Sequence, residues 1–461
     1  MYRFLVCHDQ NIIGENQSTA PSETPQHTLF SRETLPARSI LRFLFDKLES
    51  AFDRPKALAK RFQLRERRNF ERPNLPLRNP LLGLRSSLHK ITRSGPLMMS
   101  FEQFLQNVSY DPLVAARQHV ATGGRAIGFV GPDIPVELIL AADAFPLQLC
   151  TDPDGNTPLA DQHFEPSFSE LAKSIAEQWL SGKLDFLNSI VFSRASDSIQ
   201  RCYYYLSDLH NSGHSRAPKP HIFDVAKIPR ATSVSHTHRA ILSLAKALSA
   251  APNRLPEAVT LRDRRRALMA RLAAARRSPE APGGVISSKL LQIADSVPAN
   301  ELDRQIEAWL GQTHPTQLGP RVLLAGSAPT GSWIHEAVEV ADGCVVSEIG
   351  EHAIERFGPP IGPSANPSYA LAEHYHRLNS SARSFDDPAD RITRSAIEYR
   401  VDGAVLWLTE EDEALPWQLP ALTGALNRLN IPALILCRQR RSDQCNAASQ
   451  ISRFVSGLGG H

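Results

Sequence analysis

Residues 321–348 read RVLLAGSAPTGSWIHEAVEVADGCVVSE, and this stretch decides the fold. Its first apolar run, residues 322–325, stops at Gly326, and a second apolar run follows the pair Asp342-Gly343. Short runs rich in Val and Leu and bounded by turn residues are typical of strands that are buried on both faces. The amphipathic segment 332–340 between them begins with a serine that can cap a helix. The sequence therefore predicts a parallel strand–helix–strand unit.

The same layout occurs earlier in the chain, at residues 125–149, RAIGFVGPDIPVELILAADAFPLQL. Residues 127–130 predict a strand, and residues 136–142 predict a helix. Further strands are predicted at 189–192, 220–225, 404–408 and 432–437. The chain thus contains two copies of one doubly wound α/β unit, 125–229 and 321–441.

We predict three folded regions: a first α/β lobe at 99–229, a helical linker region at 230–320 and a second α/β lobe at 321–461. The linker contains RDRRRALMARLAAARR at 262–277, which carries seven arginines. We interpret this segment as a solvated helix face, and a phosphate-binding edge is the alternative.

Residues 1–98 differ from the rest in charge, with 17 Lys and Arg against 9 Asp and Glu. We expect a basic, disordered extension, or an upstream stretch that is not part of the native protein, because Met98-Met99 offers a natural start. A basic arm for nucleic acid and an organelle-targeting segment are less favoured alternatives, because charge runs are usually solvated and the segment also contains acids.

The six cysteines (Cys7, Cys150, Cys202, Cys344, Cys437 and Cys445) are scattered and contain no CxxC pair. We therefore predict no disulfide framework and a reducing cytoplasm. No apolar stretch reaches the roughly 20 residues that a membrane span requires. Nucleotide-binding glycine motifs, GxSxG and HExxH are absent from the sequence. The pairs His236/His238 and His374/His376 lie in segments expected to be helical, where i and i+2 diverge, so we predict no metal site there.

Ligands of open parallel sheets bind beyond the carboxyl ends of the strands. Two facing lobes would therefore enclose a cleft, and the helix N-termini that follow the strand-end loops would offer N–H groups to anions and acyl oxygens. The loops expected to line this cleft are 131–135, 161–169, 193–197, 326–332 and 409–415.

These loops carry a resemblance that extends in order from about residue 100 to 455. The chain resembles the 2-hydroxyacyl-CoA dehydratase D-component family, which includes benzoyl-CoA reductase subunits. The segments that carry the resemblance are IPVELILAADAFPLQL (134–149), LDFLNSIVFSRASDSIQR (184–201), RVLLAGSAPTGSWIHEAVEVADGCVV (321–346) and VDGAVLWLTEEDEALPWQLPAL (401–422).

The resemblance implies two flavodoxin-like lobes, an acyl-CoA thioester ligand and pairing with a related subunit, as a homodimer or heterodimer. It also implies a four-iron–four-sulfur cluster held by three cysteines. In this chain Glu165, Ser196 and Asp412 stand at those three positions. Because such clusters depend on thiolate donors, we predict no cluster and no other cofactor.

The cleft would then hold Glu165, Ser196, Asp197, Asp412 and Glu413. We predict Glu165, Ser196, Asp412 and Glu413 as catalytic, because facing carboxylates and a hydroxyl support acid–base chemistry if burial raises one pKa. The competing interpretation makes them polar fillers, with Ser196 and Asp197 capping a helix. Two functions follow: an acyl-CoA-binding lyase of this family without a cluster, or a non-catalytic partner subunit of a cluster-bearing dehydratase or reductase. A nucleic-acid binder with a basic arm is a third hypothesis.

Overall fold

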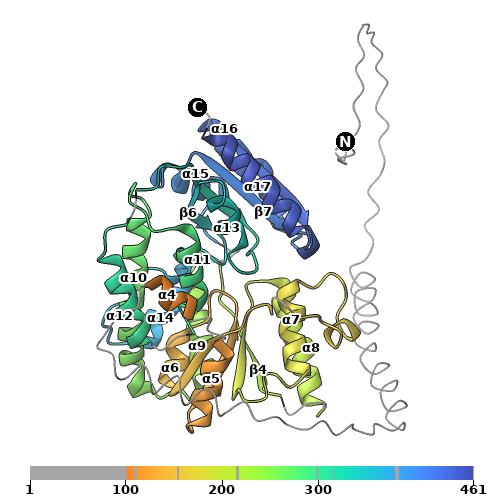
Figure 1. Cartoon of the computed structure of the whole chain (residues 1–461). Coiled ribbons are helices and arrows are strands. Elements are labelled where there is room, and N and C mark those ends of the chain that lie inside the picture. The colour runs from red at the N-terminus through yellow and green to blue at the C-terminus, as the bar shows by residue number, and fades with distance from the viewer. Residues whose placement is uncertain are drawn as a thin grey trace, which may run out of the picture. The chain divides into compact units, whose positions relative to one another are not determined.

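The computed structural model describes residues 101–107, 112–152, 155–213, 217–296, 299–314, 316–378 and 384–459 (Figure 1). The described residues all belong to the unit Pro96–His461. The expectations for residues 1–98, including a nucleic-acid arm, lie outside the described residues. Within the described ranges, no helix combines the length and apolarity needed to cross a membrane.

The first lobe is built on a parallel sheet with strand order β2-β1-β3-β4. The central strands β1 and β3 are buried almost throughout, which explains their continuous apolar sequences. Its strands are β1 (Arg125–Val130), β2 (Ala144–Gln148), β3 (Ser189–Ser193) and β4 (Lys219–Phe223). One face packs against α5 (Pro112–Ala121), α7 (Glu170–Leu180) and α8 (Asp197–Asn211), and the other against α6 (Val136–Ala141), α9 (Ala231–Leu248), α10 (Leu255–Ala275) and α14 (Pro367–Arg377).

The second lobe repeats this design with strand order β6-β5-β7-β8. Its strands are β5 (Arg321–Gly326), β6 (Cys344–Ile349), β7 (Gly403–Thr409) and β8 (Ala433–Gln439). Helices α15 (Pro388–Glu398) and α16 (Leu419–Arg428) cover one face, and α13 (Trp333–Glu339) and α17 (Gln444–Leu458) cover the other. The predicted α/β class with two doubly wound lobes is confirmed.

A helical layer packs around a third apolar core, which includes Leu272, Leu290 and Trp309. It is formed by α4 (Phe101–Asn107), α10, α11 (Gly284–Ile293) and α12 (Ala299–Leu310), and Figure 1 shows these helices beside one another. The remaining short elements are the 3-10 turns η2 (Ala160–Gln162), η3 (Pro252–Arg254), η4 (Ile354–Phe357), η5 (Leu415–Gln418) and η6 (Arg441–Asp443).

The arginine-rich segment of α10 is not a solvated face, so that interpretation was wrong. Arg262, Arg265, Arg266 and Arg276 are all buried, the last two with only 1% of their surface exposed. Each of the four forms an ion pair with a carboxylate. This agrees with the general rule that a buried charge is tolerated only when it is paired. Arg264, Arg271 and Arg277 are the exposed members of the segment.

Two of these buried arginines join α10 to the two lobes. Arg266 forms an ion pair with Glu137 in α6 of the first lobe, and Tyr375 donates to the same carboxylate at 2.8 Å. Arg276, just after α10, donates two hydrogen bonds of 2.7 Å to Glu348 in β6 of the second lobe. The pKa of each carboxyl is lowered despite its burial, so the charges of both pairs are retained.

A glycine at the end of β5 allows close approach of the neighbouring strand. Gly326 has a φ of +119°, and a Cβ at this position would lie 2.0 Å from the carbonyl oxygen of Trp407 in β7. Gly331, five residues later in the same connection, also has a positive φ, +76°, but nothing lies within 4 Å of its Cβ position.

We expect Gly326→Ala to destabilise the second lobe strongly and Gly331→Ala to cost only about 1 kcal/mol of backbone strain. The difference arises because only the first substitution forces two central strands apart. Chemical denaturation of both variants measures the two free energies of unfolding. Equal losses would show that the strand contact at Gly326 does not matter.

Candidate functional site

The chain order of each sheet reverses beside its first strand, between β1 and β3 and between β5 and β7. Such switch points, at the carboxyl ends of parallel strands, form the ligand crevices of doubly wound folds. In the first lobe the crevice is crossed by a hydrogen bond from the Ser193 hydroxyl, at the end of β3, to Asp133, in the loop after β1. The Ser193 oxygen accepts a bond of 2.9 Å from the N–H of Ala195, which fixes the loop after β3.

The second lobe has a corresponding hydrogen bond between a serine and an aspartate. Here the serine follows the first strand of the lobe and the aspartate follows the third, the reverse of the first lobe. Ser327, after β5, donates at 3.1 Å to Asp412, in the loop after β7. The Ser327 oxygen accepts from the N–H of Thr409 at 3.1 Å. The other carboxylate oxygen of Asp412 accepts from the N–H groups of Ala414 and Leu415 at 3.3 and 3.1 Å, which closes the turn that leads to η5.

The loops after β1, β6 and β7 carry three carboxyl groups, two of which act on the third through their charges. Glu351, two residues after the end of β6, is a half-buried residue whose pKa is raised to about 7, first by burial of the carboxyl and then by the charges of Asp133 and Asp412. Among the described residues, none donates a hydrogen bond to the Glu351 side chain. We call Asp133, Glu351 and Asp412 the carboxylate cluster; one member comes from the first lobe and two from the second.

The two lobes also contact each other directly beside these loops. The Arg441 guanidinium, in η6 of the second lobe, lies 3.1 Å from the Glu170 carboxylate at the start of α7 in the first. The N–H of Glu170 donates to Glu411 at 3.4 Å. The strand-end loops of the two lobes therefore meet, as the predicted cleft required.

Among the four residues predicted as catalytic, the structure places only Asp412 in the carboxylate cluster. Glu165 is exposed and accepts a hydrogen bond of 3.0 Å from the Tyr205 hydroxyl. Ser196 occupies the N-cap position of α8 but makes no side-chain capping bond, and Glu413 is exposed. In the part of the chain that the structure describes, no hydrogen bond or ion pair joins these three to Asp412.

The predicted capping of α8 by side chains is wrong for both candidate residues. The Ser196 hydroxyl does not accept from the first turn of the helix, and the Asp197 carboxylate instead forms an exposed ion pair of 3.0 Å with Arg201 one turn later. By contrast, the Ser169 hydroxyl caps α7 by accepting from the N–H of Ala172 at 3.2 Å.

Residues 133–454 match the family model described as 2-hydroxyglutaryl-CoA dehydratase, D-component. The match covers more than half of the chain and includes every strand of the two sheets except β1, together with the whole carboxylate cluster. The chain belongs to this family. No curated protein matches the chain significantly.

The family resemblance implies a four-iron–four-sulfur cluster, which requires thiolate ligands. The strand-end loops of this chain offer oxygen atoms instead. Cys202 and Cys344 are buried within the cores of opposite lobes, where burial raises the pKa of both thiols. Cys150 and Cys445 are exposed, and no group of three His, Cys, Asp or Glu among the described residues is arranged to hold a metal ion. The three positions that the resemblance assigns to cluster ligands hold Glu165, Ser196 and Asp412 in this sequence.

Sequence reasoning missed Asp133 and Glu351 as members of the site. Asp133 lies within the predicted cleft loop 131–135, whereas Glu351 follows the edge strand β6, whose loop is not among the loops predicted to line the cleft. The signal was present in the sequence EIGEH at 348–352, where an acid follows a buried strand and a glycine. A carboxylate at the carboxyl end of a parallel strand is a candidate site residue by that placement alone.

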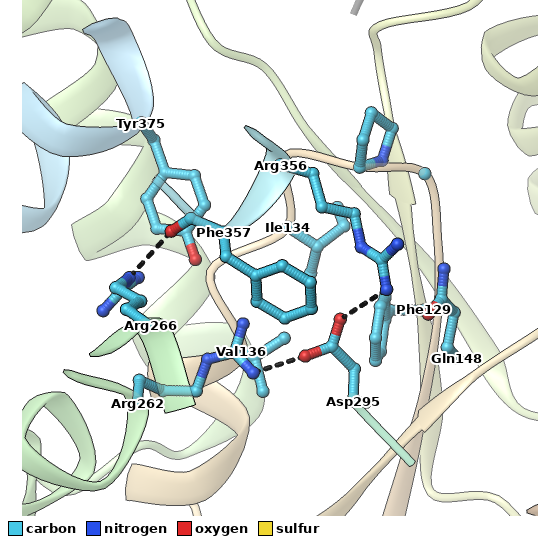
Figure 2. Close-up of a pocket in the computed structure, with 12 residues that line it drawn as sticks. Phe129, Ile134, Val136, Gln148, Arg262, Arg266, Asp295, Arg356, Phe357 and Tyr375 are labelled. Carbon is cyan, nitrogen blue, oxygen red and sulfur yellow. Dashed lines mark hydrogen bonds and ion pairs between the residues drawn. The ribbon is translucent and has the colours of Figure 1, made fainter. Parts of the chain in front are cut away.

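A small polar cavity lies next to the site, at the carboxyl ends of β1 and β2 (Figure 2). Asp295 lies between the guanidinium groups of Arg262 and Arg356 and pairs with both. The cavity volume is about 10 Å³, which holds roughly one water molecule. The Nε atoms of both arginines and Oε1 of Gln148 have no hydrogen-bond partner among the described residues, so a bound water suits it.

We expect Glu351→Gln to remove a pH dependence from the stability of the protein. Between the ordinary carboxyl pKa of 4.5 and about 7, the folded state keeps a proton that the unfolded state has released. The free energy of unfolding of the wild type therefore falls as pH rises through this window. Glutamine does not titrate, so thermal denaturation should show the wild type losing stability relative to the variant between pH 4.5 and 7.

Glu413→Gln, on an exposed carboxylate of the neighbouring loop, provides the matched control and should follow the wild-type pH profile. A stability difference between wild type and Glu351→Gln that is the same at pH 5 and pH 8 would contradict the assignment.

Proposed function

We propose that this chain binds an acyl-CoA thioester between its two lobes and eliminates or adds water by acid–base chemistry, without an iron–sulfur cluster. The family supports the thioester, and the carboxylate cluster supports the chemistry. The observation that carries the proposal is Glu351, a carboxyl with its pKa raised to about 7 and with two further carboxylates beside it.

A thioester carbonyl makes the hydrogen on its α-carbon acidic, because the resulting charge is delocalised onto the carbonyl oxygen. A carboxylate can therefore take this proton, while a protonated carboxyl gives its proton to a hydroxyl on the β-carbon. The C–O bond breaks with its electron pair, water leaves, and a carbon–carbon double bond forms. No electron enters or leaves, so this route needs no redox group.

The three carboxyl groups suit these two roles. Protonated Glu351 acts as the general acid, because a pKa near 7 leaves a large protonated fraction at neutral pH. Asp412 or Asp133 acts as the base. The first turn of α8 follows β3 at the same sheet edge, and Ser196 leaves its N–H groups without a side-chain acceptor, so these groups can receive the thioester oxygen.

Glu351→Gln should therefore lower kcat for hydration of an enoyl-CoA by about 100-fold or more, the usual range for loss of a general acid or base. Crotonyl-CoA is the probe, and loss of the enoyl absorbance measures the reaction. Binding should survive, so the same thioester should still raise the melting temperature of the variant. Glu165→Gln should leave kcat close to wild type, because its carboxylate is exposed and bonded to Tyr205.

Absence of any stabilisation by acyl-CoA thioesters would contradict the proposal. So would anaerobically purified protein that carries stoichiometric iron and sulfide, with a visible absorption spectrum. Equal activity of wild type and Glu351→Gln would remove Glu351 from the mechanism.

A second candidate, a non-catalytic partner subunit, is favoured by a different observation. Trp417 in η5 is 86% exposed, directly after the loop that carries Asp412, and the edge strand β8 leaves Ile435 43% exposed. A related subunit of the same family would cover such a surface. Co-expression with a cluster-bearing relative tests this: a stable complex that is lost in Trp417→Ser supports the candidate, and failure to co-purify opposes it.

A further inference from the structure

A second, larger pocket lies away from the carboxylate cluster, where the two lobes and the helical layer meet. It has a volume of about 470 Å³, which is in the range of small-molecule sites. Its walls are the turn after η4, helix α14 and helix α15. Helix α14 packs into the first lobe through Leu371, and α15 packs into the second through Ile392. The pocket thus occupies a junction between domains, where ligand sites are common.

Charged groups of both signs alternate along the walls of this pocket. Arg391 lies 3.1 Å from Glu355, and Arg394 lies 2.9 Å from Asp386. Arg377 lies 3.7 Å from Glu373, and Glu398, also on the wall, pairs with Arg277 at 2.6 Å. A ligand that carries charge of only one sign would be repelled by one member of every ion pair on the wall. A ligand with one positive and one negative group can contact both the acidic and the basic side chains.

Arg391 is the best-placed cation, because only 12% of its side chain is exposed. One of its nitrogen atoms contacts Glu355, and a guanidinium has five N–H donors in a fixed plane. Donors therefore remain for a ligand carboxylate. The acidic side chains of the same pocket can accept hydrogen bonds from an ammonium group of the ligand.

Apolar residues form another part of the lining: Ile361, Ala370 and Leu378 together with two prolines at 359–360. His374 also lines the pocket, and its Nε2 is buried without a hydrogen-bond partner among the described residues. Burial, and then the Arg266 charge, lower its pKa to about 4, so the imidazole is neutral. Gly358 makes space for this ring, since a Cβ there would lie 2.7 Å from it.

We propose that this pocket binds a free α-amino acid with an apolar side chain. Arg391 holds the carboxylate, the acids of the wall hold the ammonium group, and the side chain lies along Ile361 and Leu378. The site is separate from the carboxylate cluster, and the proposal does not depend on the proposed function.

The test is calorimetric titration of the full chain with L-leucine, L-leucinamide, N-acetyl-L-leucine and glycine. Leucine should bind, whereas leucinamide lacks the carboxylate, the acetyl derivative lacks the ammonium charge, and glycine lacks the apolar body. Arg391→Gln should weaken leucine binding by about tenfold or more, since it removes a charged hydrogen bond. Arg428→Gln, an exposed position on α16, should leave binding unchanged.

A second variant keeps the test independent of the ion pair between Arg391 and Glu355. Ala370→Phe fills the pocket and should abolish binding, while Ala421→Phe, at an exposed position on α16, should not. Circular dichroism establishes that each variant is folded. The proposal is overturned if leucine does not bind, if the amide or acetyl derivative binds equally well, or if folded Ala370→Phe binds like the wild type.

Discussion

The structure depends on one helix that pairs a buried arginine with each lobe. Arg266 in α10 meets Glu137 of the first lobe, and Arg276, ten residues later and about 15 Å along the axis, meets Glu348 of the second. Such pairs contribute little net stability when complete, but loss of one partner costs about 3–5 kcal/mol because it leaves a buried charge alone. Both carboxylates are further satisfied, by the Tyr375 hydroxyl and by the His335 ring. These contacts fix both lobes to α10, and so they determine which strand-end loops face each other.

The duplication of the lobes extends beyond the order of their strands. At the amino ends of the sheets, Asn188 accepts a hydrogen bond from the N–H of Ala126, and Asp402 accepts one from the N–H of Arg321. At the carboxyl ends, a serine and an aspartate cross each switch point, with their places exchanged between the lobes. In each lobe, the turn after the helix that follows the first strand places an aspartate at positive φ, 56° at Asp143 and 60° at Asp342. Repeated polar contacts of this kind indicate that both lobes solve the same problem, which is how to end two adjacent parallel strands without leaving buried backbone groups unpaired.

The sequence predicts the strands and helices well, because periodicity and turn residues are local signals. It predicts the long-range polar contacts poorly. The arginines of α10 look like a solvated face since their partners Glu137 and Glu348 are 129 and 72 residues away, and no local pattern reveals them. The same limit applies to the site: Asp412 was identified from its loop, but its neighbours Asp133 and Glu351 come from two other loops, and only the packing of the lobes brings them together. Glu165 lies in the loop before α7 and Ser196 at the start of α8. The Glu165 side chain bonds to Tyr205 instead, and the Ser196 side chain makes no capping bond.

The carboxylates of the cluster differ in how they are stabilised, and this difference favours Glu351 as the group that carries a proton. Asp412 accepts from one hydroxyl and two backbone N–H groups, and Asp133 accepts from the Ser193 hydroxyl. Among the described residues, none donates to the Glu351 carboxyl, and the charges of both aspartates raise its pKa. A carboxyl that lacks donors and has negative charges near it holds its proton more strongly. The loop shapes are meanwhile maintained by hydrogen bonds between serine and aspartate, so the strand ends keep their arrangement through the chain's own side chains.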